Sequence, residues 1–299
     1  MSTEKRNENF MLKQSRYSKG KKNVKQYSKN NASKKSGSGK NSYNAYYKKN
    51  DDGFQPKSNG KSNYGKKKYP SKSKGYPKKN AQKPSIKIAF LGGLNEIGKN
   101  ITLVECENDI IIIDCGMAFP DGDMLGVDLV IPDFTYIEQN ADRVKGIILT
   151  HGHEDHIGGL PFLLSKVNVP IYGTPLTLGL VGNKLKEHSL YNQSQLNVIN
   201  AGQSIKLGCM KIDFIHVNHS IPDAVAFAIH TPGGTIVHTG DFKIDCTPIT
   251  GDMIDLSSFA RVGDEGVLAL LSESTNAERP GYTPTERTVS DSLDNLFKS

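Results

Sequence analysis

Five of six consecutive residues in one stretch of this sequence carry side chains that bind metal ions in proteins. From residue 151 the stretch reads His-Gly-His-Glu-Asp-His, and it directly follows an apolar run. Imidazole and carboxylate groups together suit divalent ions such as zinc, manganese or iron. His151 and His153 can project together from an extended turn onto one ion, whereas Asp155 and His156 point to a different place. The spacing therefore predicts two ions a few ångströms apart.

The alternative for this stretch is a polar surface loop whose histidines lie together by chance. A lone histidine would favour that interpretation, but three histidines and an aspartate so close together after an apolar strand argue against it. Glu154 differs from its neighbours, which already fill the ligand positions, so we expect it to face solvent or a backbone donor. Glycines at 152, 158 and 159 let the backbone turn tightly beside the ions.

A site for two ions needs ligands from elsewhere, and three candidates stand at the ends of apolar runs. His219 follows an alternating run, and Asp241 closes another, where its carboxylate can bridge both ions. Asp114 ends a run of isoleucines and suits the role of orienting a ligand histidine. For His219 or Asp241 taken alone, an ordinary polar residue at a strand end is an equal alternative. The histidines interpreted as structural are His188, His216, His230 and His238.

These side chains need strands and helices to bring them together. Short β-branched runs predict strands, and two longer segments predict helices. Strands and helices mix without strict alternation, which indicates an α/β layered domain with a mixed sheet. The predicted strands are Ile86–Phe90, Ile101–Glu105, Ile110–Asp114, Val144–Leu149, Lys211–Val217, Ala224–Ile229, Thr235–His238 and Val267–Leu271, and the predicted helices are Gly159–Ser165 and Pro175–His188.

The first 84 residues differ from the rest in composition. They carry 24 of the 38 Lys and Arg residues and four of the 31 Asp and Glu residues, a local net charge of +20 that leaves −13 for the remainder. They almost lack Leu, Ile and Val, so we expect residues 1–84 to be a disordered basic tail. Eight of the twelve tyrosines lie among these lysines, a mixture that suits phosphates and unpaired bases. A nonspecific RNA- or ribosome-seeking arm is one interpretation, and a solubilising tail or a binder of anionic surfaces is the other.

The end of the sequence, its cysteines and its hydropathy add further expectations. The run Thr283-Pro284-Thr285-Glu286 predicts a capping box with Thr283 as the N-cap of a helix. The sequence stops at Ser299 soon after, as if cut within a larger protein. The four cysteines form no C-x-x-C pair, which favours reduced core thiols in a cytosolic protein. There is no secretory signal and no run of about 18 apolar residues, so no membrane span is expected.

Together these residues carry a family resemblance. The stretch from His151 to His156 is similar to the His-x-His-x-Asp-His signature of the metallo-β-lactamase superfamily, and Asp114, His219 and Asp241 match its other motifs in order. From about residue 85 onward the sequence resembles the ribonuclease J family, in the β-CASP group of that superfamily. The stretches that carry this likeness are GGLNEIGKN at 92–100, NHSIPD at 218–223, TGDFK at 239–243 and SESTNAERPG at 272–281.

The resemblance implies a fold and a ligand set. The fold is a four-layer αββα sandwich over residues 85–285, interrupted by a β-CASP domain that begins at 286–299 and is cut there. The ions would be two Zn²⁺, with Mn²⁺ or Mg²⁺ as alternatives, and the family takes one more histidine from beyond the point where this sequence ends. By matching positions, one ion is held by His151, His153 and His219, the other by Asp155 and His156, and Asp241 bridges them.

The resemblance also implies a function. It indicates a cytoplasmic bacterial ribonuclease of RNA maturation and decay, which cuts internally and trims from the 5′ end. Its partners would be RNA, the ribosome or RNA-decay proteins, and further copies of itself in a dimer or tetramer. Two ions would acidify a shared water, whose pKa on a catalytic zinc falls to about 7, for attack on phosphorus. The expected catalytic residues are Asp155, His156, Asp241 and Asp114. Hydrogen bonds to the RNA backbone are expected from Ser274, Thr275 and Asn276, although a plain turn explains these three equally well.

Two other classes of function stay open. One is a hydrolase of a small thioester or lactone that uses the same ions, against which stand the basic tail and the stretch 272–281. The other is a noncatalytic RNA-binding subunit, which the missing last ligand of the second ion favours.

Overall fold

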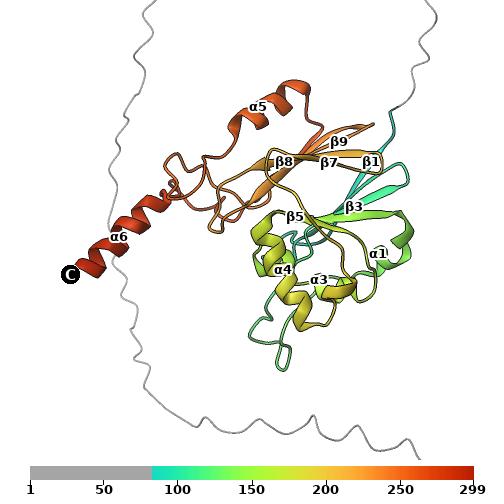
Figure 1. Cartoon of the computed structure of the whole chain (residues 1–299), viewed down its shortest axis with the longest axis horizontal. Coiled ribbons are helices and arrows are strands. Elements are labelled where there is room, and N and C mark those ends of the chain that lie inside the picture. Colours follow the sequence, from blue (N-terminus) through green and yellow to red (C-terminus); the bar gives the residue numbers. More distant parts are fainter. Residues whose placement is uncertain (1–82) are drawn as a thin grey trace, which may run out of the picture. The chain divides into compact units, whose positions relative to one another are not determined.

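The structure is a computed structural model that describes residues 83–299. The disordered tail predicted at 1–84 lies almost entirely outside the described residues. The boundaries expected at residues 85 and 286 between tail, first domain and second domain stay predictions. The described part of the chain folds as two packed sheets with helices on their outer faces (Figure 1).

The first sheet has six strands, whose order across the sheet follows the chain. The pairs formed by the first, second and third strands are antiparallel, and every pair from the third strand to the sixth is parallel. The second strand is buried along its whole length, since the sheet is covered on both faces. The strands are β1 (Ile86–Gly92), β2 (Ile101–Cys106), β3 (Asp109–Ile113), β4 (Val144–Ile148), β5 (Ile171–Gly173) and β6 (Leu196–Val198).

The second sheet has five strands in the order β11-β10-β9-β8-β7. All neighbours are antiparallel except β10 and β11, which are parallel. The apolar runs of β8 and β9 supply most of its buried side chains. The strands are β7 (Ser204–Leu207), β8 (Met210–His216), β9 (Val225–Thr231), β10 (Gly234–His238) and β11 (Ala269–Leu271).

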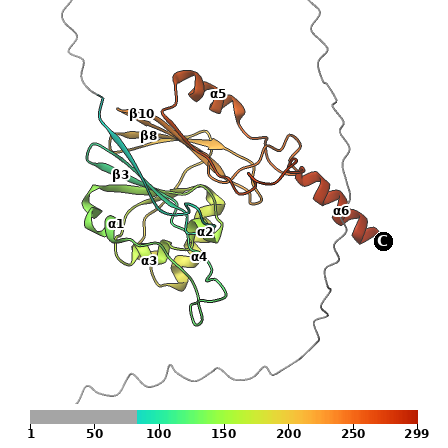
Figure 2. The same cartoon turned by 180° about the vertical axis from the view of Figure 1, so that it is seen from behind.

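Helices complete four layers. One apolar cluster lies between the first sheet and its helices, a second between the sheets, and a third beneath the helix over the second sheet. Figures 1 and 2 show α1, α3 and α4 on the outer side of the first sheet and α5 on the outer side of the second. The αββα sandwich is therefore confirmed. The helices are α1 (Thr135–Gln139), α2 (Glu154–Ile157), α3 (Leu160–Leu164), α4 (Pro175–Glu187), α5 (Leu256–Glu265) and α6 (Glu286–Lys298), with 3₁₀ turns at Ala141–Arg143 and Tyr191–Gln193.

The eight predicted strands and two predicted helices all exist, with ends shifted by no more than two residues. The short strands β5, β6 and β7 and the helices α1, α2 and α5 were not predicted. Strands of three or four residues have too few positions to show a period, and β5 and β6 form because neighbouring strands supply their hydrogen-bond partners.

The predicted start of the last helix is wrong. Thr283 is not the N-cap: α6 begins at Glu286, and Thr285 is the N-cap, whose hydroxyl accepts a hydrogen bond from the backbone N–H of Arg287 at 3.4 Å. A tertiary contact decides this register, because the buried carboxylate of Asp245 accepts the N–H of Glu286 at 2.9 Å. A capping pattern in sequence cannot report an acceptor that lies some forty residues away.

All four cysteines are free, but only Cys106 and Cys115 are buried; the expectation of core thiols is wrong for Cys209, which is partly exposed, and for Cys246, which is exposed. Among residues 83–299, no helix is both long and apolar enough to cross a bilayer.

Candidate metal centre

The histidine-rich stretch begins where a buried strand ends. β4 places Ile148 in the core, Leu149 and Thr150 follow it and are also buried, and the chain then enters the single turn of α2. His151 and His156 are buried, whereas Asp155 is partly exposed, with 35% of its side-chain surface accessible. The loop thus displays its ligand-type groups from the rigid end of the sheet.

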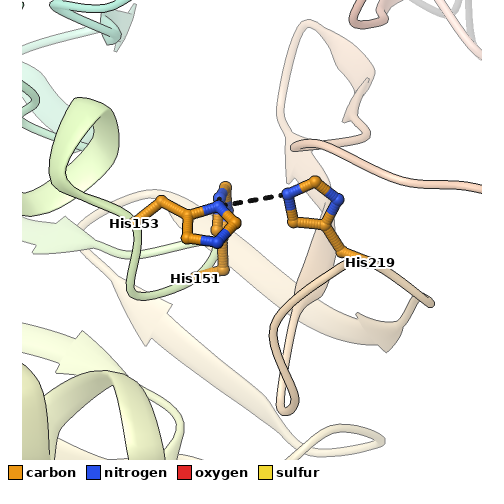
Figure 3. Close-up of side chains that lie close together, drawn as sticks. All are labelled: His151, His153 and His219. Atoms are coloured by element: carbon orange, nitrogen blue, oxygen red, sulfur yellow. Dashed lines mark hydrogen bonds between the residues drawn. The ribbon is translucent and has the colours of Figure 1, made fainter. Parts of the chain in front are cut away.

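Three histidines converge from two loops (Figure 3). The Nε2 atom of His151 lies 3.0 Å from Nδ1 of His153, and the same Nδ1 atom lies 3.2 Å from Nε2 of His219. Two imidazole nitrogens bound tetrahedrally to zinc, each about 2.0–2.1 Å from the ion, lie roughly 3.4 Å apart. The three rings therefore already have nearly the spacing of a zinc ligand set.

A second group adjoins the first. His151, His156 and Asp241 bring ligand atoms within 4.8 Å of one another. The Oδ2 atom of Asp241 lies 3.5 Å from Nε2 of His156 and 3.8 Å from Nε2 of His219, so one carboxylate faces both groups. Asp155 stands beside this group, with Oδ2 3.6 Å from Nε2 of His156. The imidazole and carboxylate donors fit a pair of divalent ions with Asp241 between them.

A buried carboxylate fixes the orientation of His156. Asp114, at the end of β3, is 1% exposed, and its Oδ2 atom lies 2.8 Å from Nδ1 of His156. Asp114 also accepts the N–H of Thr150 at 2.8 Å and the hydroxyl of Thr150 at 2.7 Å. Since Nδ1 of His156 donates to Asp114, its Nε2 atom faces the ion site.

The two loops from the second sheet are tethered separately. The carbonyl of Asn218 accepts the N–H of Lys243 at 2.8 Å, which ties the loop of His219 to the loop of Asp241. At the far end of the first of these loops, the carboxylate of Asp223 accepts the N–H of Leu176 at 3.2 Å, in the first turn of α4. His219 is therefore held between a strand-like bridge and a helix terminus.

Electrostatics distinguish the two buried histidines. Burial, followed by the charge of His156, lowers the pKa of His151 to about 2, so His151 is a neutral ligand at pH 7. Burial also lowers the pKa of His156, but Asp114 and Asp241 outweigh it and raise that pKa to about 10. Burial raises the pKa of Asp241, but its hydrogen bond to His156 and the nearby histidines bring it down to about 2, so Asp241 is ionised.

Close approach of the loops requires glycine at two positions. A Cβ atom on Gly116 would lie 1.6 Å from the carbonyl oxygen of Asp155, so no other residue fits between β3 and the ligand loop. Gly240 has a φ of +58°, and a Cβ atom there would lie 2.9 Å from Thr150. These glycines let the Asp114 and Asp241 loops meet the histidine loop.

A cavity of about 790 Å³ opens beside the second group. Its wall includes Asp155, His156 and Asp241 on one side and Ser274 and Thr275 on the other. The predicted substrate-binding residues thus occupy a turn that also faces the ligands. Asn276 does not line the cavity; its carbonyl accepts the N–H of Arg279 at 3.0 Å within that turn.

Sequence reasoning missed one wall of this cavity. The loop 92–98 lines it, and Asn100 at the end of the loop contacts both Asp155 and His156. The signal available in the sequence was the pair of glycines Gly93 and Gly98 around polar residues. In the structure both glycines adopt a positive φ.

The expectation that Glu154 faces solvent is confirmed, since 47% of its side-chain surface is exposed. Its carboxylate forms an ion pair with Lys184 of α4 at 2.7 Å, because the ligand loop packs beside that helix. The histidines interpreted as structural contact other groups: His216 lies 3.0 Å from the carbonyl of Asp252, His230 lies 2.9 Å from Asp213, and His238 accepts the N–H of Gly240.

Comparison with known proteins gives a consistent result. Residues 94–276 match the Metallo-beta-lactamase superfamily. Ribonuclease J 1 of Streptococcus pyogenes serotype M3 is 50% identical over 208 residues, which cover 70% of this chain and 37% of that protein. Ribonuclease J2 of Bacillus subtilis is 47% identical over 223 residues, 74% of this chain and 40% of that protein. The chain thus spans well under half the length of these curated relatives.

A solved structure shows the same fold. A protein of unknown function from Enterococcus faecalis V583 superposes with a TM-score of 0.54, covering 71% of this chain and 57% of that chain at 17% identity. At this identity the likeness concerns the fold alone.

Proposed function

The chain belongs to the metallo-β-lactamase superfamily, and on that premise we propose that it carries the metal centre of a ribonuclease that hydrolyses RNA phosphodiesters. The observation that carries the proposal is the convergence of His219 and Asp241 on the 151–156 loop, with ligand atoms of each group within 4.8 Å of one another beside an open cavity. The relatives named ribonuclease J, at 47–50% identity, support RNA as the substrate.

Each residue of the centre has a proposed role. His151, His153 and His219 would hold one ion, Asp155 and His156 would hold the other, and Asp241 would serve both. Divalent ions bound there would supply Lewis acidity for attack by water on phosphorus and for the charge that builds on the phosphate oxygens. Zinc is the best match to a set dominated by imidazole, with manganese or magnesium as the alternatives.

The rest of the chain prepares this chemistry. Asp114 holds the ring of His156 so that Nε2 faces the centre, and the cavity admits substrate on the side of Asp155 and Asp241. Ser274 and Thr275, across the cavity, would donate hydrogen bonds to the RNA backbone. The excess of acidic residues after position 84 opposes RNA, so the basic segment 1–84 would supply attraction by counterion release.

Finer properties are part of the proposal. We assign both internal cutting and 5′-to-3′ trimming to the intact protein. Association with the ribosome or with RNA-decay proteins, assembly into a dimer or tetramer, and a cytoplasmic location stay predictions.

The test is a double substitution in the intact protein. His151→Ala with His153→Ala should abolish cleavage of a 5′-monophosphorylated, end-labelled RNA, because two of three ligands of one ion are lost. The matched control, His188→Ala with His216→Ala, removes two histidines outside the centre and should leave cleavage unchanged. RNA cleavage that survives the first pair would exclude this site. A wild-type protein that hydrolyses a small thioester but not RNA would favour the other enzyme class.

A further inference from the structure

Asn100 is a polar side chain at the centre to which neither the sequence nor the proposed ligand set assigns a task. It is the last residue of the loop 92–100 and directly precedes β2. Its Nδ2 atom lies 3.1 Å from the carbonyl oxygen of Asp155, 3.3 Å from Oδ2 of Asp155 and 3.1 Å from Nε2 of His156. One carboxamide therefore contacts both residues proposed to hold the second ion.

The backbone around Asn100 keeps this carboxamide in place. The N–H of Asn100 donates to the carbonyl of Asp155 at 3.0 Å, and the carbonyl of Asn100 accepts the N–H of Gly116 at 2.9 Å. The N–H of Lys99 donates to the carbonyl of Met117 at 3.0 Å. On the other side, a Cβ atom at Gly93 would lie 2.5 Å from Oδ1 of Asn100, so the amide oxygen packs against the glycine backbone. The amide nitrogen is thus aimed at the ligands.

The count of hydrogen-bond donors does not match the count of acceptors. A carboxamide nitrogen has two hydrogens, but three acceptor atoms of Asp155 and His156 lie within reach. If Nε2 of His156 binds an ion, two acceptors remain for two hydrogens. These are the carbonyl and one carboxylate oxygen, both of Asp155.

We propose that Asn100 is a positioning residue: by donating to Oδ2 of Asp155, the carboxylate oxygen that faces His156, it holds that carboxylate in place beside the second ion. The inference rests on the proposed function only in requiring that the cluster binds two ions. Asn100 also fixes the backbone of Asp155, so the loop 92–100 sets the position of a ligand that belongs to another part of the sequence. Groups that hold metal ligands in orientation change metal affinity by about 10–100-fold when they are removed.

The test measures ion affinity rather than turnover. The intact protein is stripped with a chelator and titrated with Zn²⁺ by calorimetry. Asn100→Ala should bind the first Zn²⁺ as the wild type does and the second about 10–100-fold more weakly. The matched control is Asn168→Ala, which removes an amide bond of 2.8 Å to the carbonyl of Gln193 away from the centre and should leave both affinities unchanged.

A double-mutant cycle separates positioning from general support of the fold. If Asn100 acts through the carboxylate of Asp155, then Asn100→Ala should add less than about twofold to the loss of second-ion affinity in an Asp155→Ala background. Equal losses in both backgrounds, or equal weakening of both ions, would overturn the inference. Should the alanine variant fail to fold, Asn100→Leu, which keeps the side-chain size but removes both donors, is titrated in its place, and unchanged second-ion binding there overturns the inference as well.

The wild-type titration separates this inference from the proposed function. A wild-type protein that binds fewer than two ions contradicts the proposed two-ion centre itself. Two ions in the wild type with undiminished second-ion affinity in Asn100→Ala contradicts the role of Asn100 and leaves the proposed function standing.

Discussion

The two sheets contribute to the proposed metal centre in different ways. The first sheet supplies four proposed ligands within six residues, on one loop braced by buried polar groups, and the side chain of His156 is only 3% exposed. The second sheet supplies His219 and Asp241 from separate loops, and the side chain of Asp241 is 26% exposed. The side chains of one half of the centre therefore lie together because they are close in sequence, whereas those of the other half are brought together by hydrogen bonds between distant segments.

The bracing also differs in kind. On the first sheet, Asp114 and Asn100 contact ligands directly. On the second sheet, Asn218 and Asp223 hold the loop of His219 at its two ends. Substitutions on the two sides should therefore differ in size, and the following predictions are ordered from the largest expected effect.

The largest effect should come from the carboxylate that faces both halves. Asp241→Asn removes a charge that lies between His156 and His219, so we expect RNA cleavage to fall by more than about 100-fold, beyond the range for residues that only orient ligands. Asp213→Asn is the matched control, because Asp213 also pairs with a histidine of the second sheet, at 2.9 Å, but away from the centre. Rates are measured on end-labelled RNA. Similar rates for the two variants would show that the halves do not share an ion.

A smaller loss should follow when the brace of the first sheet is altered. Asp114→Asn cannot accept all three of its present hydrogen bonds, so His156 should lose its fixed orientation. We expect bound Zn²⁺ to be released about 10–100-fold more easily, measured by competition with a chelator. Asp109→Asn, at the opposite end of β3, serves as the control. Unchanged zinc retention in Asp114→Asn would mean that His156 keeps its orientation without the carboxylate of Asp114.

The tether of the second sheet should matter less. Asp223→Gly removes the carboxylate that accepts the N–H of Leu176 without straining the φ of +64°. Loss of one hydrogen bond of about 1 kcal/mol corresponds to about fivefold weaker binding of the first Zn²⁺, measured by calorimetry. Asp223→Asn keeps an acceptor and tolerates this φ, so it should bind like the wild type. Equal loss in both variants would point to charge rather than to the tether.

The smallest effect should fall on stability alone. Asp255 caps α5 by accepting the N–H of Ser258 at 3.0 Å, and hydrogen bonds from Ser257 and Ser258 bring its pKa down to about 2. Because its pKa is lowered on folding, it stabilises the protein above a pH of about 4, and that stability is lost as the pH falls toward 2. Asp255→Asn should change the free energy of unfolding at pH 7 by no more than about 1 kcal/mol and reduce its decline in acid.

Denaturant unfolding from pH 2 to pH 7 measures this effect, with RNA cleavage at pH 7 as the control that should not change. Asp133→Asn is the matched substitution, on the exposed turn before helix α1, which covers the first sheet. It should change the acid decline of the free energy of unfolding by less than Asp255→Asn does. A steeper acid decline in Asp255→Asn than in the wild type would contradict the sign of this prediction.

The sequence by itself determined the ligand types, their crowding after β4 and the strands that carry them. Successive side chains of a strand point to opposite faces of the sheet. Alternation of apolar and polar residues, and runs of β-branched residues, therefore locate strands in the sequence. Thr150 and the ligand loop could be placed at a strand end for the same reason, and Asp114, His219 and Asp241 stand at the ends of such runs. Local pattern was enough because these signals depend on neighbours along the chain.

Only the tertiary structure decided which of these ends meet. The contacts of Asn100 with Asp155, of Asp223 with α4 and of Asp245 with the start of α6 join segments some forty residues or more apart. Each forms because sheet packing delivers an acceptor to a donor that has no local partner, and no spacing in the sequence encodes that meeting. The short strands and the register of α6 were missed for the same reason.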